Sequence, residues 1–109
     1  MTTFDSYQRD GVTVLRPEGK LNMVAAPKLR QQIADAVGTG QTRLVIDLSG
    51  TDFLDSSGLG ALVAGLKAAR QAGGDLRIAC PGEQIRLVLD LTSMTGVLRP
   101  YQSIDEASR

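Results

Sequence analysis

The 109-residue sequence contains no histidine, no tryptophan and a single cysteine, Cys80. The absence of histidine excludes a Ser-His-Asp triad, a Cys-His pair and every zinc site that uses histidine. One cysteine cannot form an internal disulfide, which is typical of proteins from reducing compartments. We therefore expect a protein that is not an enzyme, with no catalytic residue, no metal site and no cofactor.

Neither sign of charge is in excess, because 12 lysines and arginines balance 12 aspartates and glutamates. Binding to a nucleic-acid backbone needs a basic surplus, so we expect no nucleic-acid partner. The longest strongly apolar stretch, 59–66, is far shorter than the about 20 residues that cross a bilayer, and residues 1–4 lack a charged-then-apolar leader. We expect a cytoplasmic protein without a membrane partner, folded as a single domain over residues 1–109.

Turn signals and hydrophobic spacing predict strands that alternate with helices. Asp10-Gly11 predicts a hairpin turn before a strand at 12–15, and the nearly continuous aliphatic run 44–48 predicts a central strand covered on both faces. Residues 59, 62, 63 and 66 are apolar at offsets 0, 3, 4 and 7, the pattern of an amphipathic helix.

Weaker signals complete the predicted order of elements. Pro27 and Pro81 suit the first turns of two more helices, and short strands are expected at 20–22, 76–79 and 97–101. Residues 49–55 read as a polar connection, and the tail from Ser103 offers at most one helical turn. The prediction is an α/β fold: a mixed four- to five-stranded sheet with an N-terminal β-hairpin and about four helices packed mainly on one side.

The junction between the central strand and the amphipathic helix has an unusual composition. Asp55, Ser56 and Ser57 each suit the cap of a helix, but one cap would be enough. Gly58 and Gly60 lie in the first turns, where each costs about 1 kcal/mol relative to alanine. The glycines either allow tight packing on the sheet or leave backbone open for close approach by another molecule.

The run Asp55-Ser56-Ser57-Gly58-Leu59-Gly60 resembles the hallmark of the STAS-domain anti-sigma factor antagonists. The resemblance extends over nearly the whole chain, including 19–22, 44–48, 72–76 and the late helix. It implies a STAS fold and a partner switch: the unphosphorylated protein binds an anti-sigma factor that is also a serine kinase, and so frees a sigma factor. The resemblance further implies Ser56 as phosphoacceptor and a metal-dependent serine phosphatase that resets the switch. We expect the free protein to be a monomer.

The predicted partner-binding surface surrounds that phosphoacceptor. Apolar residues near it either form an exposed docking patch or fold back onto the edge of the core. Asn22 stands where family members often carry an aspartate, so phosphorylation is in question if that charge is needed; its plainer interpretation is a turn residue. The predicted binding residues are Asn22, Met23, Asp52, Phe53, Leu54, Asp55, Ser56, Ser57, Gly58, Leu59 and Gly60.

Other functions remain open at this point. One is a STAS module that senses a nucleotide or lipid through Gly58 and Gly60, although Gly-x-Gly without a neighbouring lysine is a weak phosphate signal. A second is a constitutive STAS scaffold without a phospho-switch. A serine hydrolase is least favoured, because it would need a lysine base. Cys80 is interpreted as a small buried hydrophobe, with a regulatory thiol as the alternative.

Overall fold

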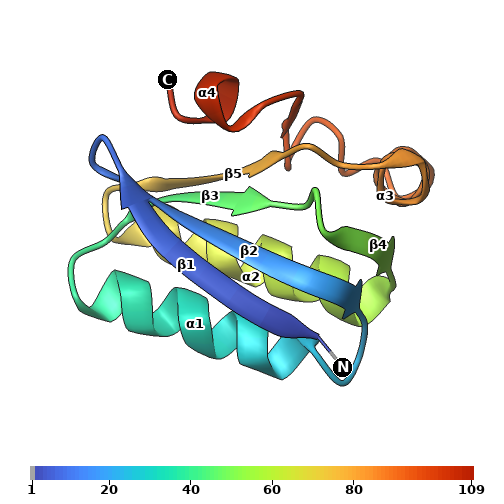
Figure 1. The fold of residues 1–109 in the computed structure, drawn as a ribbon, viewed down its shortest axis with the longest axis horizontal. Helices are drawn as coiled ribbons and strands as arrows, with labels where there is room; N and C mark the ends of the chain where they lie inside the picture. Colours follow the sequence, from blue (N-terminus) through green and yellow to red (C-terminus); the bar gives the residue numbers. More distant parts are fainter. Residues whose placement is uncertain (1) are drawn as a thin grey trace.

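Six strands form one sheet and four helices lie against it in the computed structural model, which describes residues 2–109 (Figure 1). The strands are β1 (Thr3–Arg9), β2 (Val12–Leu21), β3 (Arg43–Asp47), β4 (Thr51–Leu54), β5 (Asp75–Ala79) and β6 (Pro100–Tyr101). The helices are α1 (Ala26–Gly38), α2 (Ser56–Gln71), α3 (Glu83–Leu91) and α4 (Ile104–Ala107). The predicted mixed α/β fold is confirmed, with one strand more than expected.

The sheet has the order β1-β2-β3-β5-β6, and β4 pairs separately with β2. Among the strand pairs of residues 2–109, only β1–β2 is antiparallel. Its turn has positive φ at Asp10 (51°) and Gly11 (79°), the conformation of a type I′ hairpin, as predicted. The weakly patterned first segment is a strand because this turn aligns it along residues 12–18 of β2.

Strand β2 is longer than the sequence predicts and has a different parallel partner at each end. Its first half pairs with β3 through 13–15, and its second half pairs with β4 through 19–21. Gly19 takes a φ of 114° at an irregularity in the register, so the chain bends there without leaving the sheet. The prediction of a separate strand at 20–22 is therefore wrong, because residues 20 and 21 are the end of β2.

The prediction of a polar connection without a strand at 49–55 is also wrong, because β4 lies within this segment. Strand β4 has buried ends, Thr51 and Leu54, and exposed middle residues, Asp52 and Phe53. With only four residues, it has no room for a recognisable alternation. Its pairing with β2 brings the segments that follow both strands to one edge of the sheet.

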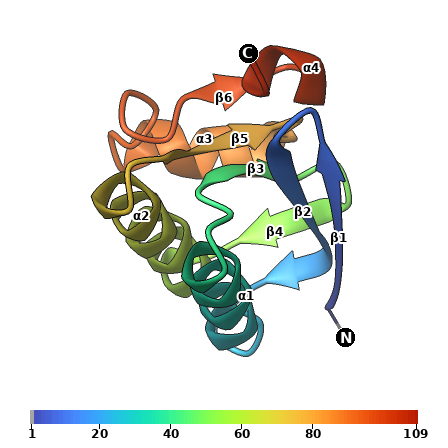
Figure 2. The ribbon, with the colours of Figure 1, turned by 90° about the vertical axis from the view of Figure 1, so that its left-hand side faces the viewer.

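Helices cover both faces of the sheet, with the two longest on the same face (Figure 2). Alternate residues of β3 point to opposite sides: Leu44 and Ile46 join the core under α1 and α2, and Val45 joins a smaller cluster with Ala107 of α4. The central strand is thus buried on both faces, as predicted. Helix α3 begins at Glu83 after an extended Gly82, so the expectation that Pro81 opens it is wrong by two residues.

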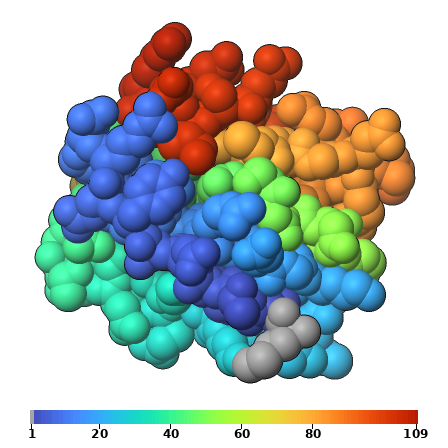
Figure 3. Space-filling model, viewed as in Figure 1, coloured from blue at the N-terminus to red at the C-terminus, as the bar shows by residue number. Residues whose placement is uncertain are grey.

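The C-terminal segment packs beside the N-terminal hairpin (Figure 3). Arg9 of β1 forms an ion pair with Asp105 of α4, which joins segments from the two ends of the sequence. No helix within residues 2–109 is long and apolar enough to cross a membrane.

Candidate functional site

The predicted site lies where β2 and β4 end and where α1 and α2 begin. Parallel pairing places Leu21 opposite Leu54, and the Asp55 amide donates to the Leu21 carbonyl at 3.4 Å. Ser56 is the first residue of α2. The loop after β2 and the start of α2 therefore share one edge of the molecule.

The Asp55 carboxylate joins these two segments. Its Oδ1 accepts from the Gly58 amide at 2.9 Å, which caps α2. Its Oδ2 accepts from the Met23 amide at 3.2 Å, which fixes the loop after β2. One side chain thus satisfies a free amide of the helix and sets the position of the neighbouring loop.

Ser56 is exposed and takes no part in capping. Its hydroxyl makes no hydrogen bond with any residue that the structure describes. Ser57 is half-buried. The capping interpretation therefore applies to Asp55 alone, and the Ser56 hydroxyl is accessible to another molecule.

The two glycines of the motif have different surroundings. A Cβ on Gly58 would lie 2.1 Å from the Leu21 carbonyl oxygen, so this buried glycine lets α2 pack directly on the end of β2. A Cβ on Gly60 would meet only the end of the Arg30 guanidinium, at 3.3 Å. The tight-packing interpretation is confirmed for Gly58, and the expectation that Gly58 leaves open backbone for a ligand is wrong.

Asn22 folds the loop that precedes α1. Its Oδ1 accepts from the Val24 amide at 3.1 Å and from the Ala25 amide at 3.2 Å. This is the turn that a short polar side chain makes with the backbone two or three residues later. The turn interpretation of Asn22 is confirmed, and the turn presents Met23 and Val24 outward.

Exposed apolar side chains lie in the same loops as Ser56. Met23 is 71% exposed, Val24 74% and Phe53 37%. Leu54 is 1% exposed and belongs to the core, so its predicted place in the docking patch is wrong. We name the exposed group the Ser56 surface; it consists of Met23, Val24, Asp52, Phe53 and Ser56.

Three further residues lie beside the Ser56 surface: Leu59 and Gly60, which the sequence predicts, and Gln84, which it does not. Leu59 is partly buried and packs against the core, and Gly60 is partly exposed. Gln84 of α3 pairs with the free edge of β4: its Oε1 accepts from the Leu54 amide at 2.9 Å, and its Nε2 donates to the Leu54 carbonyl at 3.1 Å. No spacing in the sequence connects residues 54 and 84.

Cys80 belongs to the packing of the other face of the sheet. It lies against the cluster around α4, and its thiol donates to the Gln102 carbonyl at 3.5 Å. Burial and, to a smaller extent, the Asp47 carboxylate raise the pKa of the Cys80 thiol. These conditions favour the protonated, unreactive thiol and support the packing interpretation.

Within residues 2–109, no three His, Cys, Asp or Glu side chains are arranged so that they could hold a metal ion. The site thus consists of an exposed hydroxyl, two aspartates and three exposed apolar side chains. Such a surface suits contact with another protein.

Known proteins are similar to this chain in sequence and in fold. A family model described as "STAS domain" matches residues 3–107. The crystal structure of an anti-sigma factor antagonist from Mycobacterium paratuberculosis is 33% identical, with a TM-score of 0.87, and the match covers 98% of this chain and 91% of that one. The anti-sigma-B factor antagonist of Bacillus subtilis is 28% identical over 94 residues, which are 86% of this chain and 85% of that protein.

A third relative shares the fold at lower identity. The anti-sigma factor antagonist SpoIIAA in its unphosphorylated form has a TM-score of 0.82 at 22% identity, covering 96% of this chain and 92% of that one.

Proposed function

Because the chain belongs to the STAS domain family, we propose that it is an anti-sigma factor antagonist switched by phosphorylation of Ser56. Unmodified, it binds an anti-sigma factor with serine kinase activity and so releases a sigma factor; a serine phosphatase reverses the modification. Residues 1–109 act as one STAS domain that is monomeric until it meets this partner. The observation that carries the proposal is the exposed, unbonded Ser56 hydroxyl beside exposed apolar side chains.

The Ser56 surface has the composition of a protein-binding site. Met23, Val24 and Phe53 are apolar, exposed and close in the fold to the start of α2. Buried apolar anchors provide most of the binding energy at protein interfaces. We assign these three side chains as anchors and the Ser56 hydroxyl as the group that the partner kinase phosphorylates.

A phosphate on Ser56 would change binding more than folding. It adds about −1.5 to −2 charge at neutral pH, and a helix start favours an anion by roughly 0.3 to 1 kcal/mol. Repulsion from Asp52 and Asp55 opposes this gain, so the effects on stability largely cancel. An interface that fits a neutral hydroxyl would instead bury an unpaired dianion, at a cost of about 2 to 5 kcal/mol, or roughly 30- to 4,000-fold in affinity.

The proposal gives Asn22 a structural role. Its carbonyl oxygen already accepts two amides of its own loop, and the carboxylate nearest in sequence to Ser56 is that of Asp55. The proposal assigns the carboxylate beside the phosphoacceptor to Asp55 and the folding of the neighbouring loop to Asn22.

The test is to incubate the purified chain with ATP, Mg²⁺ and a candidate anti-sigma factor kinase and to locate phosphate by mass spectrometry. We expect one phosphate, on Ser56, that Ser56→Ala removes. Ser57→Ala is the matched control, because it deletes the adjacent hydroxyl and should keep the phosphate. Calorimetry should then measure at least about 30-fold weaker binding to the kinase after phosphorylation.

Two results would contradict the proposal. Phosphate on Ser57 in the unmodified sequence would move the acceptor away from the exposed hydroxyl. Equal affinity of the phosphorylated and unphosphorylated protein for the kinase would exclude a switch at this surface.

A further inference from the structure

Three arginines line a small hollow near the C-terminal end of α2. The hollow has a volume of about 120 Å³ and lies between α2, β5 and β6. Arg70, Arg77 and Arg99 contribute positive charge, and Asp75 contributes the one negative side chain of the lining. Arg70 follows Ser56 by fourteen residues of helix, or about 21 Å along the axis, so the hollow is remote from the Ser56 surface.

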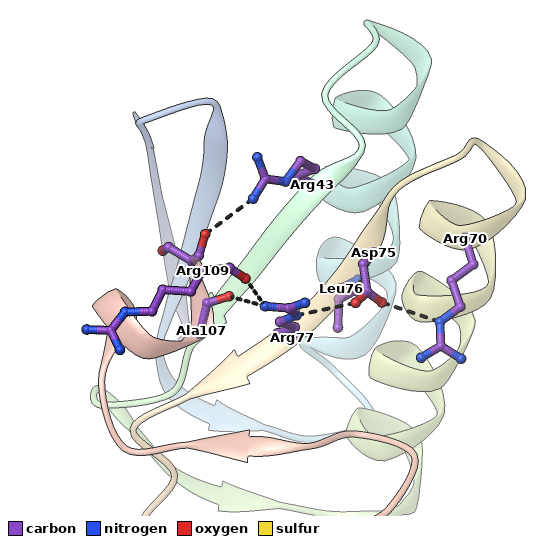
Figure 4. Close-up of polar contacts among 8 residues, drawn as sticks. Arg43, Arg70, Asp75, Leu76, Arg77, Ala107 and Arg109 are labelled. Atoms are coloured by element: carbon purple, nitrogen blue, oxygen red, sulfur yellow. Dashed lines mark hydrogen bonds and ion pairs between the residues drawn. The ribbon is translucent and has the colours of Figure 1, made fainter.

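Asp75 holds two of the guanidiniums in place (Figure 4). Its Oδ1 accepts from Nε of Arg70 and its Oδ2 accepts from Nε of Arg77, both at 3.3 Å. Arg70 is held through Nε alone, and its two terminal nitrogens have no hydrogen-bond partner among residues 2–109. The acid therefore orients the arginines while leaving terminal donors available.

Arg77 is fixed more firmly than Arg70. Its Nη1 donates to main-chain oxygens of Ala107, at 3.3 Å, and of Arg109, and its guanidinium lies over the Tyr101 ring, 5.6 Å from the centroid. Its Nη2 has no hydrogen-bond partner in the described part of the chain. A guanidinium fixed in this way loses little freedom when it binds a ligand.

The guanidinium of Arg99 carries a positive charge that no described acidic side chain pairs with. It is exposed and lines the hollow, and it forms no ion pair or hydrogen bond with any described side chain. Three arginines against one aspartate leave the lining with two positive charges in excess. A phosphate monoester carries about −1.5 to −2 charge at neutral pH, and its oxygens match the fork of a guanidinium.

We propose that this hollow binds the phosphate group of a phosphorylated small molecule, with Arg70, Arg77 and Arg99 as its ligands. A phosphate monoester offers three oxygens to the three guanidiniums, whereas a carboxylate offers two. The site does not depend on the proposed function, because no residue of the Ser56 surface contributes to it.

The test is an NMR titration of the labelled protein with inorganic phosphate, with ionic strength kept constant by sodium chloride. We expect saturable shifts of the amides around residues 70, 75–77 and 99–101, and no saturable shift with acetate. Arg99→Gln and Arg70→Gln should each weaken phosphate binding about tenfold or more. Arg99→Lys keeps the charge but loses the fork and should bind with intermediate affinity.

Arg30→Gln is the matched control, because Arg30 is an exposed arginine of α1 outside the hollow. It should bind phosphate as the unmodified protein does. Arg77 is left intact because it also holds the C-terminal segment. The proposal is overturned by shifts that rise linearly with phosphate, by equal binding of acetate, by unchanged affinity in folded Arg99→Gln, or by a single-stranded oligonucleotide binding where phosphate does not.

Discussion

Gly58 and Gly60 are two residues apart in α2, but only one of them is required for packing. A Cβ at Gly58 would meet the main chain at the end of β2, which cannot move without disturbing the sheet. A Cβ at Gly60 would meet only the flexible end of the Arg30 side chain. The sequence indicates that both are unusual in a helix, but it does not distinguish the packing residue from the tolerant one.

We predict that Gly58→Ala destabilises the protein by about 1 to 3 kcal/mol, the usual cost of overpacking. The added Cβ would lie 2.1 Å from the Leu21 carbonyl oxygen and 2.8 Å from Cδ1 of Leu54. Gly60→Ala is the control and should be neutral or up to about 1 kcal/mol more stable, because alanine favours the helix. Urea denaturation measures both; equal effects of the two substitutions would contradict this account of the junction.

At the scale of elements, β4 depends on contacts that are distant in sequence. One of its edges pairs with β2, and Gln84 of α3 hydrogen-bonds to both backbone groups of Leu54 on the other. The side-chain amide of Gln84 makes the two hydrogen bonds with Leu54 that a neighbouring strand would otherwise make. It anchors α3 to the strand that carries Phe53 of the Ser56 surface.

We predict that Gln84→Leu destabilises the protein by about 1 to 3 kcal/mol, because Leu54 loses a donor and an acceptor in a partly buried position. Gln71→Leu makes the same chemical change at an exposed glutamine without a described hydrogen bond, and should stay within about 0.5 kcal/mol. Hydrogen exchange of the Leu54 amide gives a local measure. Unchanged exchange of that amide in Gln84→Leu would show that the pair does not hold β4.

The elements differ in how well local sequence predicts them. The periodic spacing of 59–66, the aliphatic run 44–48 and the Asp10-Gly11 turn each carry enough local information to define α2, β3 and the hairpin. Strand β4 does not, because its four residues become a strand only when β2 extends past Gly19 to meet them. The site follows the same rule: the exposure of Phe53 and the burial of Leu54 depend on the pairing of β4 with β2, and the exposure of Met23 depends on the turn made by Asn22.

At the scale of the whole molecule, the sheet is packed on both faces. We therefore expect a charge added at one edge to leave the packing of the other elements unchanged. The Ser56 hydroxyl has no described hydrogen bond to lose, and α4 holds the far face through Ala107. The proposed switch then acts through charge and shape at the contact, without a change of fold.

We predict that phosphorylation of Ser56 moves the net charge from zero to about −2 but perturbs amide chemical shifts mainly in residues 22–25 and 52–60. Heteronuclear NMR of the two forms measures this directly. Ser57→Ala phosphorylated at Ser56 should reproduce the pattern. Large shift changes in α4 or β6 would instead indicate a rearrangement transmitted through the sheet.

The division of work between Asp55 and Ser56 has an evolutionary consequence. The carboxylate caps the helix and fixes the neighbouring loop, so the hydroxyl at residue 56 contributes little to folding. Substitution there can change or abolish regulation while the protein remains folded. If the proposed switch operates, natural selection on stability acts on Asp55 and natural selection on signalling acts on Ser56, so phosphorylation at residue 56 can be lost without a compensating mutation in the core.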